Sequence, residues 1–296
     1  MTVIVRAAHA KLNVFLRVLG RRPDGYHEIE SLILPISLHD VITVEPAETL
    51  VLAVEGPTSA GVPTDERNLA LKAARALAAA AGGAGRTSGA KITIEKRIPM
   101  AAGLGGGSAD AAATLLALDE LWSLGLGPGG LMDLALTIGS DLPAVLLGEP
   151  AHVRGRGDHV DRVLVQSTTW VLVTADEGVA ARDAYAWWDE EASTGPDAGA
   201  LIAAAEAGND QLLGSALFND LQQPVARRYP WVATTCDALV AAGAHGAVMT
   251  GSGPTVVALC SFATARDVAD AVSGSIVVDA PPRSAATERI PGSGVV

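Results

Sequence analysis

The chain has 296 residues, of which 49% are hydrophobic and 18% charged, a composition typical of a folded protein with a sizeable core and not of a disordered one. Its formal net charge is −12, so it gains nothing from counterion release on nucleic acid or from an anionic membrane surface. We therefore expect no nucleic acid and no membrane as partner. Any phosphate site must be built locally from backbone N–H groups and a few cations.

The start of the chain and the two cysteines indicate the compartment. Residues 1–10 show no charged segment followed by an apolar one, and no run of about 18 apolar residues free of charge and glycine occurs. This pattern favours a cytoplasmic location. Cys236 and Cys260 have no metal-binding spacing, and we expect two buried free thiols. The sequence leaves a monomer and a homodimer both open.

Strands dominate the beginning of the first half, and helices follow. Alternating and β-branched residues predict strands at residues 2–9, 32–38, 40–44, 50–54 and 91–95. A helix is predicted over residues 68–81, opened at residues 64–66 with Thr64 as its N-cap and stopped by Gly82 and Gly83. Further helices are predicted over residues 109–122 and 131–138.

The second half repeats the mixture of strands and helices. Strands are predicted at residues 170–174, 247–250 and 255–259, and helices at residues 183–190, 198–207, 231–242 and 263–272. Because the helices are clustered and do not alternate strictly with strands, the fold class is predicted to be α+β, with mixed sheets and helices packed on them.

A division into two domains is expected near residue 160. Residues 148–161 are rich in Gly, Arg and Asp, and we expect a connecting surface loop there. The predicted domains are residues 1–160 and residues 161–280. The remaining residues 281–296 are rich in Pro, Ser and Gly, and we expect a flexible tail.

One glycine-rich stretch lies between a predicted strand and a predicted helix. It consists of Pro99, Met100, Ala101, Ala102, Gly103, Leu104, Gly105, Gly106, Gly107, Ser108 and Ala109. The glycines let backbone N–H groups approach a ligand closely, and the helix N-terminus adds its unpaired N–H groups, so the stretch suits a di- or triphosphate. Ser108 is placed to cap the helix, to touch a phosphate, or to contact its Mg²⁺. The alternative is a flexible turn with Ser108 as an ordinary N-cap. The pattern is neither a Walker A motif nor a dinucleotide fingerprint.

This stretch resembles the second motif of the GHMP kinase superfamily. Ala-Lys-Leu-Asn at residues 10–13 is similar to the first motif, and Gly-Ser-Gly-Pro-Thr at residues 251–255 is similar to the third, which lies beside the active site. The three motifs occur in the right order over most of the chain. The resemblance implies a two-domain kinase fold, ATP as phosphoryl donor, and Mg²⁺ carried by the ATP, with no dedicated metal site in the protein.

Two further runs resemble one branch of that superfamily. They are Gly-Arg-Arg-Pro-Asp-Gly-Tyr-His-Glu at residues 20–28 and Gly-Ser-Asp-Leu-Pro at residues 139–143. The branch phosphorylates the 2-hydroxyl of 4-diphosphocytidyl-2-C-methyl-D-erythritol, in the non-mevalonate isoprenoid pathway. Two alternatives stay open: another GHMP kinase acting on homoserine, mevalonate or a sugar, and a pseudokinase that binds ATP without transferring its phosphoryl group.

The resemblance also implies the catalytic pair. Asp141 matches the catalytic aspartate, which would orient the acceptor hydroxyl and take its proton, and Lys11 matches its partner, which would also face charge on the γ-phosphoryl group. Without the resemblance, Lys11 would be read as a solvated charge at a strand end and Asp141 as a helix N-cap.

The remaining candidates bind the two substrates. Tyr26 and His27 resemble the residues on the cytidine side, and Tyr185 aligns with an aromatic residue that sandwiches the cytosine. Asn13 is expected to hydrogen-bond the acceptor, and Asn68 resembles a residue of the adenine pocket. Two departures from the family pattern are His9 in place of a proline and Ala144 in place of an aromatic residue after Asp-x-Pro, and Leu104 and Pro254 vary in their loops without removing a glycine.

Overall fold

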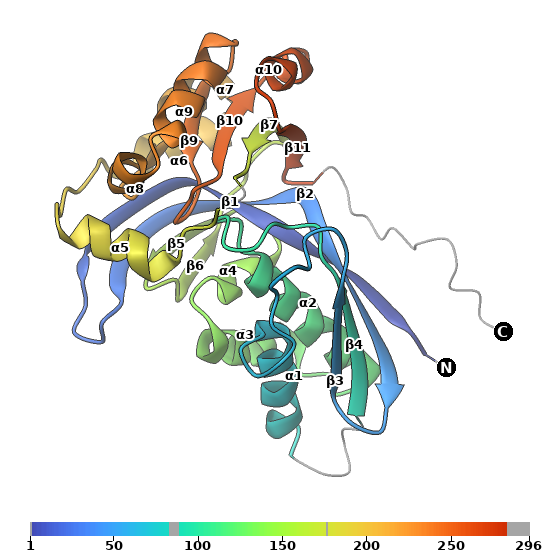
Figure 1. Cartoon of the computed structure of the whole chain (residues 1–296). Coiled ribbons are helices and arrows are strands. Elements are labelled where there is room, and N and C mark those ends of the chain that lie inside the picture. The colour runs from blue at the N-terminus through green and yellow to red at the C-terminus, as the bar shows by residue number, and fades with distance from the viewer. Residues whose placement is uncertain (1, 83–88, 176, 283–296) are drawn as a thin grey trace.

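The computed structural model describes residues 2–82, 89–175 and 177–282. Over these residues the strands form a seven-stranded sheet and a four-stranded sheet, each with helices packed against it (Figure 1). The predicted α+β class is confirmed. Gly83, expected to stop the first helix, lies outside the described residues, as does all of the expected tail beyond residue 282.

The larger sheet is organised around two long antiparallel strands, β1 and β2, which cross the middle of the molecule (Figure 1). The central strand order is β3-β4-β2-β1-β8, with β5 and β6 added through β2. Its strands are β1 (Ile4–Arg21), β2 (His27–Ala47), β3 (Val51–Glu55), β4 (Gly89–Glu95), β5 (Ala151–Gly155), β6 (His159–Arg162) and β8 (Phe218–Asn219).

The smaller sheet comes from the second half of the chain. Its order is β11-β7-β10-β9, and its neighbouring strands are antiparallel. Its strands are β7 (Thr168–Val173), β9 (Gly246–Met249), β10 (Val256–Cys260) and β11 (Ser275–Ala280). Every residue of β10 is buried, as expected for a strand covered on both faces.

The helices fall into two groups, one beside each sheet (Figure 1). The first group is α1 (Leu69–Ala80), α2 (Gly106–Leu121), α3 (Gly127–Ile138) and α4 (Leu142–Leu147). The second is α5 (Ala181–Asp189), α6 (Gly199–Glu206), α7 (Asp210–Ser215), α8 (Gln222–Arg228), α9 (Trp231–Ala241) and α10 (Ala265–Ala271). Helix α2 is buried from Ser108 to Leu118 except at Leu116, because it lies between α1 and the long strands. Its alanines permit this close packing.

Several predicted boundaries are wrong. The strands expected at residues 32–38 and 40–44 are one strand, β2. Thr64 does not cap α1. Asn68 does, since its Oδ1 accepts a hydrogen bond from the backbone N of Ala70. The elements α4, α7, α8, β5, β6, β8 and β11 were not expected, and all are short.

The region expected to connect the two domains belongs to the larger sheet. Residues 151–162 form the β5–β6 hairpin, and β5 pairs with β2. From the second half of the chain, β8 adds a parallel pair to β1. A domain division near residue 160 therefore remains a proposal, and the hairpin up to Arg162 lies on the side of the larger sheet.

Both cysteines are free and buried. Burial raises the pKa of the Cys236 thiol to about 12 and that of Cys260 to about 11. Because the thiolate is the reactive form, we expect neither cysteine of the native protein to react with Ellman's reagent within minutes, and both to react in guanidinium. A fast-reacting thiol in the native protein would contradict this packing. Among the described residues, no helix has the length and apolar character to span a membrane.

Candidate active site

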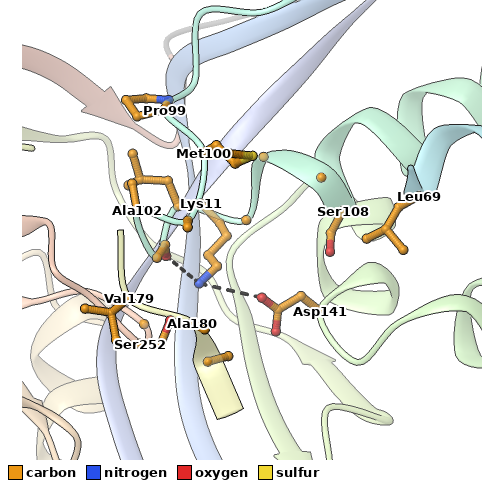
Figure 2. A pocket seen from close by; sticks show the side chains of 18 of the residues that line it. Lys11, Leu69, Pro99, Met100, Ala102, Ser108, Asp141, Val179, Ala180 and Ser252 are labelled. Carbon is orange, nitrogen blue, oxygen red and sulfur yellow. Dashed lines mark hydrogen bonds and ion pairs between the residues drawn. The ribbon is translucent and has the colours of Figure 1, made fainter. Parts of the chain in front are cut away.

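A cavity of about 490 Å³ lies between the glycine-rich stretch, the middle of β1 and the beginning of α5. It brings together predicted residues that are far apart in the sequence, and Figure 2 shows it in close-up. The predicted residues that line it are Lys11, Asn13, Asn68, Pro99, Met100, Ala101, Ala102, Gly103, Leu104, Gly105, Gly106, Gly107, Ser108, Asp141 and Tyr185. Ala109 is buried in α2 and lines a neighbouring cavity instead.

The glycine loop, residues 99–108, ends in the first turn of α2. Gly105 is the N-cap residue, with a φ of 69°, a conformation that favours glycine. The prediction that Ser108 caps this helix is wrong, because Ser108 lies inside its first turn. Since no side chain caps α2 in the described structure, its first backbone N–H groups are available to an anion from the cavity.

The glycine loop packs directly on the turn at residues 250–254. A Cβ atom at Gly103 would lie 2.3 Å from the carbonyl oxygen of Thr250, and one at Gly251 would lie 2.7 Å from the carbonyl oxygen of Gly103. Neither contact leaves room for a side chain. Gly251 and Ser252 also line the cavity, so the third motif lies beside it.

Lys11 is not a solvated charge at a strand end. It lies within β1, only 4% exposed, and its Nζ donates hydrogen bonds to Asn13 Oδ1 and, at 2.8 Å, to the carbonyl oxygen of Gly103. Burial lowers the pKa of the Lys11 ammonium, and the neighbouring Asp141 opposes this effect. The residue therefore links the glycine loop to Asp141, as the dashed lines in Figure 2 show.

Asp141 faces Lys11, with 3.7 Å between Oδ2 and Nζ. It stands at the N-cap position of α4, yet its side chain caps nothing in the described structure. Its side chain is 43% exposed, whereas that of Lys11 is 5% exposed. The carboxylate thus remains accessible from the cavity, and it can accept a proton from a bound hydroxyl.

His27 and Tyr185 come together across the two halves of the chain. Their ring centroids are 4.7 Å apart with an interplanar angle of 23°, a stacked pair. His27 Nε2 also lies 2.8 Å from Asp189 Oδ1, so α5 holds the imidazole by stacking and by a hydrogen bond. Burial raises the pKa of the Tyr185 hydroxyl.

Tyr26 is not part of this stack. Its side chain is 50% exposed and lines a separate cavity of about 190 Å³ beside Ser140. The guanidinium carbon of Arg156 lies 5.4 Å from the ring centroid of Tyr26, a cation–π contact. Tyr26 therefore lies outside the cavity that holds Lys11 and Asp141.

The two asparagines already have local partners. Asn13 accepts from Lys11 and donates to Ser31 Oγ at 2.8 Å. Asn68 caps α1 and donates to the carbonyl oxygen of Pro63. Both line the cavity, but their side chains also position Lys11 and the start of α1.

The two departures from the family pattern lie behind the site. His9 Nδ1 is 2.8 Å from the carbonyl oxygen of Ile36, and burial lowers the pKa of its imidazole. Ala144 is buried and lines a cavity of about 440 Å³ behind Lys11.

Sequence reasoning missed a buried charge cluster under the glycine loop. Lys96 is bound by Asp40 and, at 2.8 Å, by Asp110 Oδ2, and all three side chains are buried. Burial raises the pKa of Asp110 to about 7, against the opposing effect of Lys96. The one available signal was that lysine is rare here, since Lys96 is one of four in the chain.

The chain matches two family models that together cover most of its length. The model of the GHMP kinases N terminal domain matches residues 68–149, and that of the GHMP kinases C terminal matches residues 201–276. The first match includes the whole glycine loop and Asp141, and the second includes the turn that packs on the loop.

Similar proteins include curated kinases and solved structures. A 4-diphosphocytidyl-2-C-methyl-D-erythritol kinase of Symbiobacterium thermophilum is 46% identical over 254 residues, covering 84% of this chain and 88% of its own. A crystal structure of a 4-(cytidine 5'-diphospho)-2C-methyl-D-erythritol kinase is 34% identical, with a TM-score of 0.78 over 94% of this chain and 99% of its own. A homoserine kinase of Cytophaga hutchinsonii is similar in fold alone, with 19% identity and a TM-score of 0.75 over 95% of each chain.

Proposed function

Because the chain belongs to the GHMP kinase family, in the branch of the 4-diphosphocytidyl-2-C-methyl-D-erythritol kinases, we propose that it phosphorylates that compound at its 2-hydroxyl, with ATP as donor, in the non-mevalonate route to isoprenoid precursors. One observation carries the assignment of the chemistry. Lys11 and Asp141 form an ion pair beside the glycine loop, in one cavity with Tyr185.

In the proposed reaction the acceptor hydroxyl attacks the γ-phosphorus of ATP. A new phosphorus–oxygen bond forms, the bond between the γ-phosphorus and the β,γ-bridging oxygen breaks, and ADP leaves. The hydroxyl proton passes to the Asp141 carboxylate, which is accessible from the cavity. Lys11, held by Gly103 and Asn13, supplies fixed positive charge where the transferred group carries its negative charge.

The donor is proposed to bind with its phosphates at the start of α2. The uncapped N-terminus and the absence of Cβ atoms at residues 105–107 provide the room and the N–H groups. Mg²⁺ would arrive with ATP and neutralise phosphate charge. The Ser108 hydroxyl lines the same cavity and is an oxygen ligand of the kind that Mg²⁺ prefers. Use of ATP is also the basis for proposing a cytoplasmic location.

The acceptor is proposed to place its cytosine at the His27–Tyr185 pair. The imidazole can donate or accept a hydrogen bond at the base edge, and the tyrosine offers a flat face. Tyr26, the residue before His27, is proposed to contribute to the same side of the acceptor, although it lines a separate cavity.

A coupled assay for ADP release with four acceptors tests the function. We expect turnover with 4-diphosphocytidyl-2-C-methyl-D-erythritol and little with homoserine, mevalonate or galactose. Turnover of one of these three without turnover of the cytidine compound would establish a different GHMP kinase. Binding of ATP with no transfer to any acceptor would establish a pseudokinase.

Replacing Tyr185 with alanine should raise the KM for the acceptor about tenfold to a hundredfold, because stacking of one base on an aromatic ring contributes about 1–3 kcal/mol. The KM for ATP should stay within about twofold, since the glycine loop does not depend on α5 for its hydrogen bond to Lys11. Steady-state kinetics with each substrate varied in turn measures both values.

Tyr229, which packs against Trp187 outside the cavity, provides the matched control. Its replacement by alanine should leave both KM values unchanged. An unchanged acceptor KM in the Tyr185 variant would exclude the stacking role.

A further inference from the structure

The buried side chains of Asp40, Lys96 and Asp110, here called the loop anchor, join both ends of the glycine loop. Lys96 directly follows β4 at the loop's beginning, Asp110 lies in α2 just after its end, and Asp40 belongs to β2. Their exposures are 4%, 3% and 0% for Lys96, Asp110 and Asp40. One ammonium group therefore connects three elements directly beneath the proposed ATP site.

Asp40 also holds the backbone at the loop's beginning. Its Oδ1 accepts hydrogen bonds from the backbone N of Arg97 at 2.5 Å and of Ile98 at 2.8 Å, while its Oδ2 accepts from Lys96. All three donors lie at the point where the chain leaves β4. The direction in which the chain enters the loop thus depends on one buried carboxylate.

The other end of the glycine loop packs against Lys96 and Ile98. A Cβ atom at Gly106, the first residue of α2, would lie 3.0 Å from Ile98 Cγ2 and 3.4 Å from Lys96 Nζ. The helix N-terminus therefore sits against Lys96 and Ile98, with little room to shift. At the preceding position, a Cβ atom at Gly105 would lie 2.9 Å from Lys11 Cγ.

The charges indicate how Lys96 acts. Two carboxylates surround one ammonium, and Asp110 Oδ1 has no hydrogen-bond partner among the described residues. The cluster carries a net charge of −1 with both carboxylates ionised and of zero with Asp110 protonated, so in neither state does it attract phosphate. Lys96 is not a phosphate ligand in this arrangement, because its ammonium is already bound on both sides.

We propose that the loop anchor is a positioning device for the phosphoryl donor, which fixes the glycine loop and the start of α2 in the shape that binds ATP. The proposal rests on the function proposed above, in which the loop binds ATP. A buried cluster that served stability alone would affect both substrates equally or neither, whereas the loop anchor contacts only the donor side of the cavity.

The test variant is Asp40→Asn, which leaves Lys96 and Asp110 as a charge-balanced pair but places an amide N–H₂ where the Lys96 ammonium needs an acceptor. We expect the KM for ATP to rise at least tenfold, while the KM for the acceptor stays within twofold. Hydrogen exchange should be faster at the amides of residues 97–106. An unchanged KM for ATP, or a parallel rise of both KM values, would overturn the proposal.

The matched control is Asp220→Asn. Asp220 is also buried, and it also accepts two backbone hydrogen bonds, but they come from Val18 and Gly195, which lie outside the glycine loop. This variant should melt at a lower temperature and keep both KM values. If Asp40→Asn does not fold, Asp110→Asn replaces it, with a rise of at least threefold in the KM for ATP as the expected result and no rise as the refuting one.

Binding and activity assays of the unaltered chain distinguish a failure of the proposed function from a failure of the positioning role. If it binds no ATP analogue and turns over no acceptor, the proposed function fails. If it is active and Asp40→Asn has a normal KM for ATP, only the positioning role fails.

Discussion

Asparagine in place of Asp141 should lower kcat by about 10²- to 10⁴-fold, the usual contribution of a positioned general base. The substitution keeps the size of the side chain but removes the charge that faces Lys11 across 3.7 Å. An amide cannot accept the hydroxyl proton, so the loss should appear in kcat. The KM for ATP should change little, because Asp141 makes no contact that shapes the glycine loop. Steady-state kinetics at saturating acceptor measures both values.

The control for Asp141 is Asp133, an exposed aspartate on the preceding helix α3. Its change to asparagine should leave kcat unaltered. A near-normal kcat for Asp141→Asn would show that the acceptor proton leaves by another route and that Asp141 is not the base.

Methionine in place of Lys11 should lower kcat by about 10²- to 10³-fold, the range for losing one preorganised electrostatic contact to a transition state. Methionine fills much of the same buried volume but removes the ammonium that Gly103, Asn13 and Asp141 share. Because one of those contacts holds the glycine loop, the KM for ATP should rise as well. The measurement is kcat and the KM for ATP, with circular dichroism to check folding.

Lys72 serves as the control for Lys11, because it is a lysine exposed on α1. Lys72→Met should behave like the unaltered chain. If Lys11→Met folds and retains normal kcat, the proposed charge stabilisation at the γ-phosphoryl group is wrong.

The sequence contained enough local signal to predict the longer elements and the glycine loop. The core of α1 has apolar residues at helical spacing, and Gly103 and Gly105 have the positive φ values that such a loop requires. The start of α1 was misplaced because Thr64 and Asn68 are both good capping residues. Only the surrounding structure, through Pro63 and Ala70, selects Asn68.

The missed elements depend on long-range pairing. The β5–β6 hairpin contains glycines and arginines that are typical of a surface loop, and it becomes a strand pair because β2 offers a free edge. The two residues of β8 form a strand only through pairing with Phe15 and Leu16 of β1. No local pattern of residues carries that information.

The proposed catalytic pair can be predicted from the sequence, whereas the loop anchor cannot. Lys11 and Asp141 lie in recognisable motifs, so the sequence predicts their proximity, and in the structure Lys11 Nζ and Asp141 Oδ2 are 3.7 Å apart. Asp40, Lys96 and Asp110 lie at separations of 56 and 14 residues, and nothing in their sequence neighbourhoods connects them. A buried ion cluster is visible only when the tertiary structure brings its members together.

The close contact of the glycine loop with the turn at residues 250–254 has a consequence for how such a chain can change over time. A Cβ atom at Gly103 would lie 2.3 Å from the carbonyl oxygen of Thr250, and one at Gly251 would lie 2.7 Å from the carbonyl oxygen of Gly103. Neither glycine can be replaced by alanine unless the facing backbone moves. A substitution at Gly251 would also displace Lys11, whose Nζ lies 3.0 Å from a Cβ atom built there. Substitutions in the glycine loop and in the turn at residues 250–254 are therefore coupled. A chimera that joins the first half of this chain to the second half of a distant relative should keep the proposed donor site only if the relative's turn packs on the glycine loop without steric overlap.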